Sequence, residues 1–426
     1  MTLLSVVESL VLAGWMCIVL YGLFLCIANW VKRRQEAPLI QPRHVFAVVI
    51  PTTNAERLIG RALDRLTKTI LYPSGMFDLI VVPVNCTDRT TAIAREKGAT
   101  VYGPGKRRWR DRNDAIQSAL ERLASKKRYD AYLMLDTRAD VSPEILAVLS
   151  DRLSKGAKII QTGYRFAGSS KSWKAAAASV LHALSPTPFT PWSSILKWAT
   201  GIRRLGFCLS KEVVERFGVR SPSITDGHAY TTKLLHDDVA VVYAAEAVVY
   251  DHGYATPPIR SFRRQIEIRL RMLRNDALRL IKEGREWDSI AQISGGINLL
   301  MPSLTVLLGG AFFFLCLSAM LHGATLNPLE ADSFLLLGWE ILIAGILVMV
   351  LGRMALIGSP FLAYVGLPAM PFYVLWRSFK SWRWERSRRS SKAVPARAQS
   401  AQHSEKGTSS RRRPPHRRRV KQQSSN

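Results

Sequence analysis

Long apolar stretches lie on both sides of a more polar central segment. Residues 1–30 carry a single charge, Glu8, within a run longer than the roughly 20 apolar residues that cross a bilayer. Two more apolar runs follow at 298–321 and 333–352. We therefore predict a transmembrane helix at 1–30 and a C-terminal membrane region at 286–381.

The charges between these runs predict the orientation. A basic triplet at 32–34 follows the first run, whereas the loop 322–332 has two acids and no Lys or Arg. By the positive-inside rule, the N-terminus is outside and the chain from residue 31 onward enters the cytoplasm. The stretch 355–376 is apolar but contains Pro360, Pro368 and Pro371. A third span there would place the basic residues after it outside, so we expect a re-entrant or interfacial segment.

The central segment, 45–285, has the pattern of an α/β domain. Short apolar runs predict strands at 45–51, 77–85, 99–103 and 131–135. Helical periodicity appears between them, at 55–70, 89–98 and 112–126. This alternation predicts a mostly parallel sheet with helices on both faces.

Polar residues follow the predicted strands. They are Thr52, Thr53, Asn54 and Glu56 after Pro51, the last residue of the first strand, then Asn85, Thr87 and Asp88 at the end of the second, and Asp136 after the fourth. Ligands of such sheets bind beyond the carboxyl ends of the strands, so we expect these residues to gather at one edge. The chain lacks GxGxxG after its first strand, and its GPGK lacks the following Ser or Thr of a P-loop, which argues against both nucleotide motifs.

The chain has a net charge of +28, and residues 377–426 supply +14 of it with 16 Lys or Arg and 2 Glu. The tail 382–426 has few apolar residues and is expected to be disordered. No nucleic-acid module precedes it, so we expect it to bind anionic lipid and expect no nucleic-acid partner. The five cysteines form no CxxC and are expected to be isolated thiols.

Four blocks of the central segment resemble membrane-bound family 2 glycosyltransferases. They read VVIPTTNAERLIGRAL, VVPVNCTDRTTAIAREKGATVY, LMLDTRADVSPEIL and ITDGHAYTTKLLHDDVAVVYAAEAVVYDH. Cellulose, hyaluronan and poly-N-acetylglucosamine synthases belong to that group, whose catalytic domain has the GT-A fold. The resemblance implies an inverting transfer from a nucleotide-sugar donor to a glycan or lipid acceptor, at a bacterial inner membrane, for polysaccharide at or beyond the cell surface. Other subunits of polysaccharide synthesis are further expected partners.

The family's Asp-x-Asp motif, which holds Mg²⁺ or Mn²⁺, reads Asp136-Thr137-Arg138 here. The resemblance places Asp136 near the metal or the donor ribose. Arg138 repels a cation but can bind phosphate in a bidentate manner, so one hypothesis is that it replaces part of the work of the metal. The alternative is a site that has lost its function, in which Arg138 pairs with Asp136 or Asp140.

Two further motifs are altered. Asp226 corresponds to the family's general base, although Asp before GHAYTTKLL also fits a helix N-cap. Gln265 and Arg269 correspond to a Gln-x-x-Arg-Trp motif that binds the diphosphate, but the spacing differs and the Trp is missing. The arginines around them fit either diphosphate binding or a basic amphipathic helix on the membrane.

These departures leave two functions open. The first is an active hexosyltransferase, and the second is a catalytically silent glycosyltransferase-fold partner in a polysaccharide assembly. Three departures favour the silent protein. They are Val84, where the family often has an Asp that contacts the nucleotide base, Arg138 in the Asp-x-Asp motif, and Thr225, which replaces the Glu that usually precedes the family's general base. Asn85, Asp88, Asp136 and Asp226 favour the enzyme.

Overall fold

The structure is a computed structural model. It describes residues 3–32, 42–103, 108–167, 206–217, 227–251, 273–300, 304–322 and 331–369, with the single positions 176, 177, 180, 202, 270 and 302. The chain separates into one unit of Met1–Thr256 and Ser261–Pro368 and a small unit of Pro257–Arg260 and Ala369–Asn426. The tail 382–426, predicted to be disordered, lies outside the described residues.

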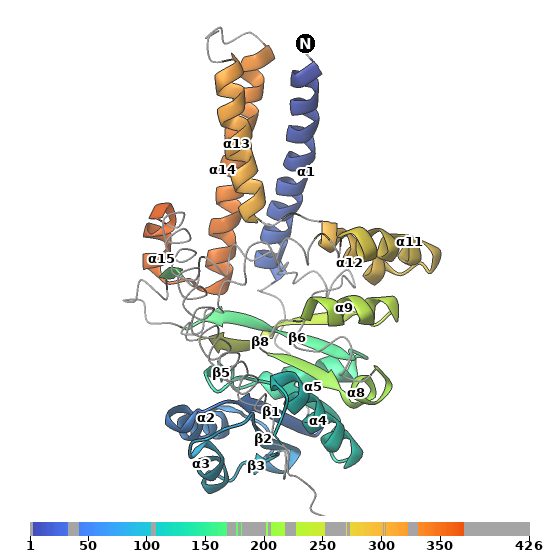
Figure 1. Cartoon of the computed structure of the whole chain (residues 1–426), viewed down its shortest axis with the longest axis vertical. Coiled ribbons are helices and arrows are strands. Elements are labelled where there is room, and N and C mark those ends of the chain that lie inside the picture. The colour runs from blue at the N-terminus through green and yellow to red at the C-terminus, as the bar shows by residue number, and fades with distance from the viewer. Residues whose placement is uncertain are drawn as a thin grey trace, which may run out of the picture. The chain divides into compact units, whose positions relative to one another are not determined.

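The central segment forms one eight-stranded sheet (Figure 1). Its strands are β1 (Phe46–Thr52), β2 (Phe77–Pro83), β3 (Thr100–Val101), β4 (Ala131–Met134), β5 (Ala139–Val141), β6 (Ile159–Phe166), β7 (Phe207–Ser210) and β8 (Val241–Asp251). Their order is β3-β2-β1-β4-β7-β6-β8-β5. Strands β5 and β7 run antiparallel to their neighbours, and the other strands share one direction. The predicted α/β class is confirmed, and the predicted strands correspond to β1–β4.

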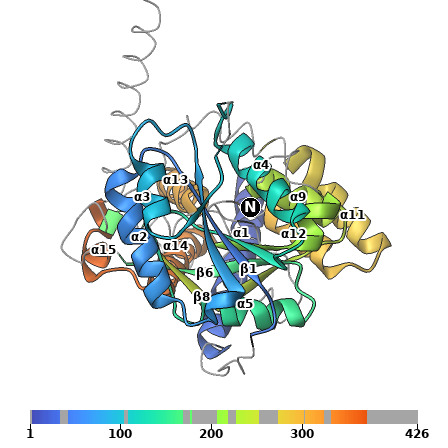
Figure 2. The ribbon, with the colours of Figure 1, turned by 90° about the horizontal axis from the view of Figure 1, so that it is seen from below.

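Helices cover both faces of this sheet (Figure 2). On one face lie α2 (Glu56–Thr69), α3 (Thr90–Glu96) and α5 (Ile145–Ser154), and on the other lie α4 (Arg112–Ser125), α8 (Lys211–Phe217) and α9 (Gly227–His236). Strand β1 shows why both faces of the sheet need to be covered by helices. Its Val48 packs toward α2 and its Val49 toward α4, because successive strand residues point to opposite faces. A strand buried on both faces needs a continuous apolar run, which is what the sequence has.

After the sheet, two helices pack closely on each other. A π-helical turn (Leu273–Ala277) leads into α11 (Leu278–Glu286), and α12 (Ile290–Leu300) follows. A Cβ at Gly284 would lie 2.8 Å from the backbone nitrogen of Ile293, and one at Gly296 would lie 2.7 Å from the carbonyl oxygen of Ala277. The two glycines therefore permit this close packing.

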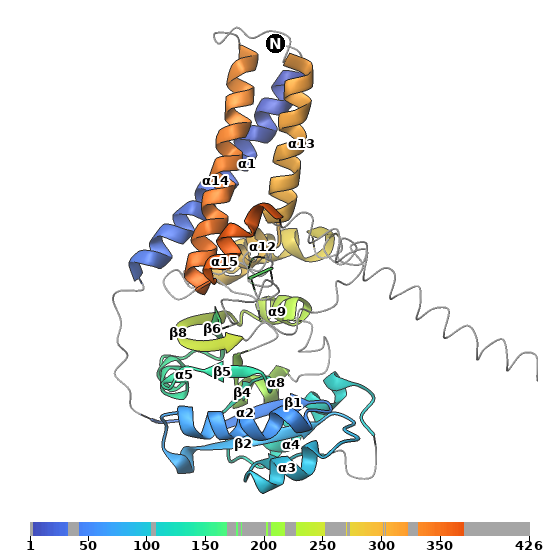
Figure 3. The same ribbon diagram turned by 90° about the vertical axis from the view of Figure 1, so that its left-hand side faces the viewer.

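Three apolar helices form a bundle (Figure 3): α1 (Leu3–Lys32), α13 (Leu304–His322) and α14 (Ala331–Ile357). Glycines on α14 recur every seven residues and face α1. A Cβ at Gly338 would lie 2.5 Å from Leu12, one at Gly345 would lie 2.9 Å from Val19, and one at Gly352 would lie 3.8 Å from Cys26. Because the partners rise together in sequence, α1 and α14 are parallel, as the predicted orientation requires.

Aromatic and polar contacts join the same bundle. Phe314 of α13 stacks on Trp339 of α14 with ring centroids 5.0 Å apart, and Trp15 of α1 meets both rings edge-on. The indole Nε1 of Trp339 donates a hydrogen bond to Glu8 Oε1 at 2.8 Å. The single charge of the first apolar run is thus buried against α14 rather than facing outward.

The lengths of these helices differ in part from the predicted spans. Ser5–Phe24 and Phe334–Leu356 are long and apolar enough to cross a membrane, and Val306–Met320 is a shorter apolar helix. The predicted span 298–321 is divided, because α12 ends at Leu300 and α13 begins at Leu304, with Pro302 between them. Proline has no N–H for a helical hydrogen bond and is disfavoured within a helix. Beyond α14, α15 (Phe361–Val365) and a 3₁₀ turn (Leu367–Ala369) are described, whereas 370–376 are not.

Candidate active site

The loops after β1 and β2 lie side by side at the carboxyl edge of the sheet. The parallel register pairs Thr52 with Pro83, so the two strands end together. Each loop then contains an asparagine with a positive φ, 46° at Asn54 and 49° at Asn85. Asparagine occupies this left-handed region more readily than most residues, which explains its presence at both turns.

Hydrogen bonds tie these loops together. Asn54 Oδ1 accepts from the backbone nitrogen of Thr87 at 2.9 Å, and Asp88 Oδ2 accepts from that of Glu56 at 3.1 Å. Glu56 Oε2 in turn accepts from the backbone nitrogen of Arg89 at 3.2 Å. The structure therefore brings Asn54, Glu56 and Asp88 together, as expected, and each carries a bond that shapes the loops.

Asp88 is held in its charged form. Burial acts to raise the pKa of its carboxyl, but hydrogen bonds from the Thr90 side chain and from the backbone nitrogens of Glu56 and Thr90 outweigh it, and the pKa is below its ordinary value. The Thr90 hydroxyl donates to Asp88 Oδ1 at 2.5 Å and accepts from the backbone nitrogen of Ala55 at 2.8 Å. Charge on Asp88 thus stabilises the junction of both loops.

Pro51, Thr52 and Val84 lie beneath these loops. All three are buried, and the Thr52 hydroxyl has no hydrogen-bond partner among the described residues. The carbonyl oxygen of Thr52 accepts from the backbone nitrogen of Val84 at 2.7 Å. Position 84 is therefore part of the core, and no carboxylate is offered there to a nucleotide base.

Asn85 binds the segment in front of α4. Its Nδ2 donates to the carbonyl oxygen of Trp109 at 2.8 Å, and its Oδ1 accepts from the backbone nitrogen of Trp109 at 3.0 Å. The indole Nε1 of Trp109 donates to the carbonyl oxygen of Pro83 at 3.1 Å. The sequence predicts that Asn85 binds the donor, and in the structure both ends of its amide hold the backbone of Trp109.

The N-terminus of α4 is fixed next to this clamp. Asp111 Oδ1 accepts from the backbone nitrogen of Asp114 at 2.9 Å, and Asp114 Oδ2 accepts from that of Arg110 at 3.0 Å. This reciprocal cap sets the position of Arg112, the first residue of α4. Sequence reasoning missed Arg112. The signal was available, because a helix that connects two parallel strands begins at the carboxyl edge of the sheet.

Asp136 is delivered to the same edge by β4. Its Oδ1 accepts from the Thr137 hydroxyl and from the backbone nitrogen of Arg138, both at 3.2 Å. Its Oδ2 lies 3.7 Å from Nη2 of Arg112. The predicted strand-end acid is thus in place, and an unpredicted arginine faces it.

The ion pairs expected of a site that has lost its function are not formed among the described residues. Asp140 Oδ1 pairs instead with Nε of Arg65 at 2.7 Å. Asp136 bonds to the backbone of Arg138, and the exposed guanidinium of Arg138 has no partner in the described part of the chain. Charge pairing with either acid therefore does not explain why an arginine occupies position 138.

A divalent cation fits this set of residues poorly. Mg²⁺ and Mn²⁺ prefer several oxygen ligands, including carboxylates. Here Asp136 supplies one carboxylate, and Arg112 faces the oxygen that is not already accepting hydrogen bonds within the turn. Over the described ranges, no group of three or more His, Cys, Asp or Glu is placed to hold a metal.

Three predicted site residues, Asp226, Gln265 and Arg269, lie outside the described residues. Helix α9 begins immediately after Asp226, and its first turn is fixed at Thr231. The Thr231 hydroxyl accepts from the backbone nitrogen of Ile202 at 3.0 Å and donates to the carbonyl oxygen of Gly227 at 2.6 Å.

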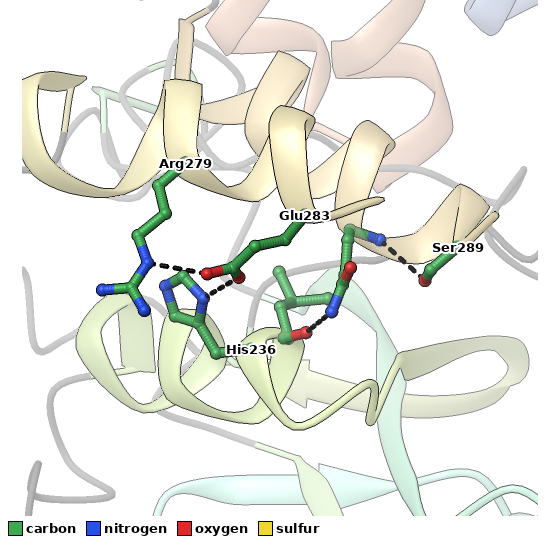
Figure 4. Close-up of polar contacts among 6 residues, drawn as sticks. His236, Arg279, Glu283 and Ser289 are labelled. Atoms are coloured by element: carbon green, nitrogen blue, oxygen red, sulfur yellow. Dashed lines mark hydrogen bonds and ion pairs between the residues drawn. The ribbon is translucent and has the colours of Figure 1, made fainter. Parts of the chain in front are cut away.

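The C-terminus of α9 is joined to α11 and α12 (Figure 4). His236 Nδ1 contacts Glu283 Oε2 at 2.5 Å, and Arg279 Nε lies 2.7 Å from Glu283 Oε1. Gln292 donates to the carbonyl oxygen of Leu235 at 2.9 Å. Burial acts to raise the pKa of Glu283, but Arg279 and His236 outweigh this and hold the pKa below its ordinary value. Sequence reasoning did not predict this joint.

Comparison with known proteins gives similarity to solved structures only. No family model matches the chain, and no curated protein sequence matches it. A mannosyltransferase from Pyrobaculum calidifontis, solved with GDP-Man and Mn²⁺, is 15% identical, covers 81% of this chain and 99% of its own, and has a TM-score of 0.43. A glucosyl-3-phosphoglycerate synthase from Mycobacterium tuberculosis is 18% identical over 54% of this chain and 79% of its own, with a TM-score of 0.37. S. aureus TarS is 14% identical over 56% of this chain and 40% of its own, with a TM-score of 0.36.

Proposed function

We propose that the protein is a membrane-bound inverting glycosyltransferase. It moves a sugar from a nucleotide-sugar donor to a glycan or lipid acceptor, in the synthesis of extracellular or cell-surface polysaccharide. The observation that carries the proposal is the convergence of three sequence blocks at one sheet edge, where the Asn54, Asn85 and Asp136 loops meet beyond the strand ends. Such an edge is where ligands bind in sheets of this kind.

The chemistry needs a base and a site for the leaving group. An acceptor hydroxyl attacks the anomeric carbon, the bond from that carbon to the diphosphate oxygen breaks, and the electron pair of that bond stays on the diphosphate. The hydroxyl proton passes to a carboxylate base, which the family resemblance assigns to Asp226. Its position directly before α9, whose two ends are anchored, supports this role, since a general base must be held within reach of its proton.

The proposed membrane location is supported by α1 and α14, which are long and apolar enough to cross a bilayer. The shorter apolar helix α13 packs on both of them, through Gly310 against Trp15 of α1 and through Phe314 against Trp339 of α14. We propose that the catalytic domain and the basic tail are cytoplasmic and that the helices anchor the site beside its acceptor. Because the described residues do not fit a divalent cation, no step of the transfer is assigned to Mg²⁺ or Mn²⁺.

Release of nucleoside diphosphate from a panel of nucleotide sugars, measured with the purified full chain and membrane lipid extract, tests the proposal. The variant Asp226→Asn should lose about 100-fold or more in rate, whereas Asp237→Asn, at the exposed end of α9, should retain it. No release from any donor would favour the silent partner. Full activity of Asp226→Asn would remove that residue from the mechanism.

A further inference from the structure

Arg112 and Arg138 both contact the carboxylate of Asp136 at the end of β4. The guanidinium of Arg112 faces its Oδ2, and the backbone nitrogen of Arg138 donates to its Oδ1. We propose that these two arginines bind the diphosphate of the donor directly and do the work that a divalent cation does in metal-using transferases. This inference rests on the proposed function and names the phosphate-binding residues of that site.

Two structural features fix the position of Arg112. The Asn85 amide holds the backbone of Trp109, three residues earlier, through two hydrogen bonds. The reciprocal cap of Asp111 and Asp114 then fixes the first turn of α4. A side chain that starts from such a rigid position loses less conformational entropy when it binds a ligand. The clamp and the cap are thus explained as devices that present Arg112.

The charges at this edge suit an anion. The arm 108–112 contains three arginines and one aspartate, and Arg108 and Arg110 are exposed. Arg138 adds an exposed guanidinium without a partner in the described part of the chain. A cation entering here would have to displace Arg112 from Asp136, whereas a phosphate is attracted by the guanidinium groups. Arginine is well suited to this role because its planar donors match two phosphate oxygens.

Asp136 then has a different function from that of a metal ligand. Its Oδ1 shapes the turn that carries Arg138, and its Oδ2 faces Arg112. It acts as a positioning residue for the two arginines. The two mechanisms therefore predict opposite results for Asp136→Asn. A metal-based site loses nucleotide binding, whereas an arginine-based site keeps it, because the amide oxygen can still accept from the backbone nitrogen of Arg138 and a negative charge opposite the phosphates is removed.

The test is equilibrium binding of UDP, GDP, ADP and dTDP to the purified full chain, each nucleotide measured in EDTA and again with Mn²⁺. We expect at least one of them to bind with the same affinity in both conditions. Arg112→Gln and Arg138→Gln should each lower that affinity about tenfold or more, which is the usual size of a charge-assisted hydrogen bond to a ligand. Arg122→Gln is the matched control, because Arg122 is exposed on the same helix about 15 Å further along.

The outcomes separate this inference from the proposed function. Metal-independent binding that falls in both arginine variants and persists in Asp136→Asn supports the arginine site. Binding that requires Mn²⁺, or that is lost in Asp136→Asn, overturns the inference and leaves a donor-binding transferase in place. Binding that is unchanged in both arginine variants also overturns it. If none of the nucleotides binds in either condition, the proposed function fails and the inference fails with it.

Discussion

The clamp between Asn85 and Trp109 gives the sharpest local prediction. Asn85→Gly removes the amide but keeps a residue that tolerates the φ of 49°, whereas Asn85→Ala removes the amide and also strains the backbone. The side chain makes two hydrogen bonds to Trp109, of 2.8 and 3.0 Å. At about 1 kcal/mol net for each bond, Asn85→Gly should favour local opening of the arm by about 2 kcal/mol, or ~30-fold.

The alanine variant should be affected more. A non-glycine residue in the left-handed region costs roughly 1–2 kcal/mol, and alanine has no side-chain amide to offset it. We therefore expect Asn85→Ala to open the arm by about 3–4 kcal/mol in total. The difference between the two variants isolates the backbone contribution from the hydrogen bonds.

Hydrogen exchange measured by mass spectrometry on peptides that cover 108–116 is the assay. It reports the amide of Trp109, which donates to Asn85, and the amide of Arg110, which donates to Asp114. Asn275→Ala, an exposed asparagine in the turn before α11, is the control and should leave exchange unchanged. Exchange in Asn85→Gly equal to that of the native protein would refute the clamp. Equal exchange in the two Asn85 variants would refute the backbone contribution.

Two further predictions concern the helices. Gly345→Leu should lower the free energy of unfolding of the detergent-solubilised protein by about 1–3 kcal/mol, seen as a lower melting temperature, because a Cβ there already lies 2.9 Å from Val19. Gly309→Leu is the control and should leave the melting temperature unchanged, since a Cβ at Gly309 meets nothing within 4 Å. Glu283 has a lowered pKa, so the stability it contributes is present above its ordinary pKa and is lost as the pH falls through the lower folded value. The native protein should therefore melt at a higher temperature than Glu283→Gln near neutral pH, and this difference in melting temperature should shrink below about pH 4. A difference that grows on acidification would contradict this reasoning.

The first half of the sheet was predictable because its signals are local. Strands β1 and β2 are apolar runs, and the helices between strands have clear periodicity, as in α4, whose buried residues fall on one side. The polar strand ends were predictable for the same reason. Parallel strands end at one edge, so Asn54 and Asn85 had to meet once both strands were placed.

The second half depends on contacts between distant segments. Strand β7 has four residues and lies between β4 and β6, and β6 shifts register at Thr162 and Gly163. A Cβ at Gly206, where φ is 67°, would lie 2.1 Å from the Thr162 hydroxyl, so this entry to β7 requires glycine. No periodic pattern of apolar residues predicts these features, because each depends on a contact with a residue more than 40 positions away in the chain. The ion pair of Arg112 with Asp136 is a different case, because a helix that connects two parallel strands begins at the carboxyl edge, where β4 also ends.

The structure also changes which residues can distinguish an enzyme from a silent partner. Asn85 and Asp88 first appeared as evidence for activity, because they match the family motif. Both residues hold the loops in place, because Asn85 hydrogen-bonds the backbone of Trp109 and Asp88 hydrogen-bonds that of Glu56. A silent protein would need these hydrogen bonds as much as an enzyme does. Arg138 is different, because its exposed guanidinium has no partner in the described part of the chain, and Asp140 pairs with Arg65 instead. Arg112 faces only one oxygen of Asp136, at 3.7 Å, among the contacts described above. Nucleotide binding by these arginines therefore separates the two functions more cleanly than the survival of the motif.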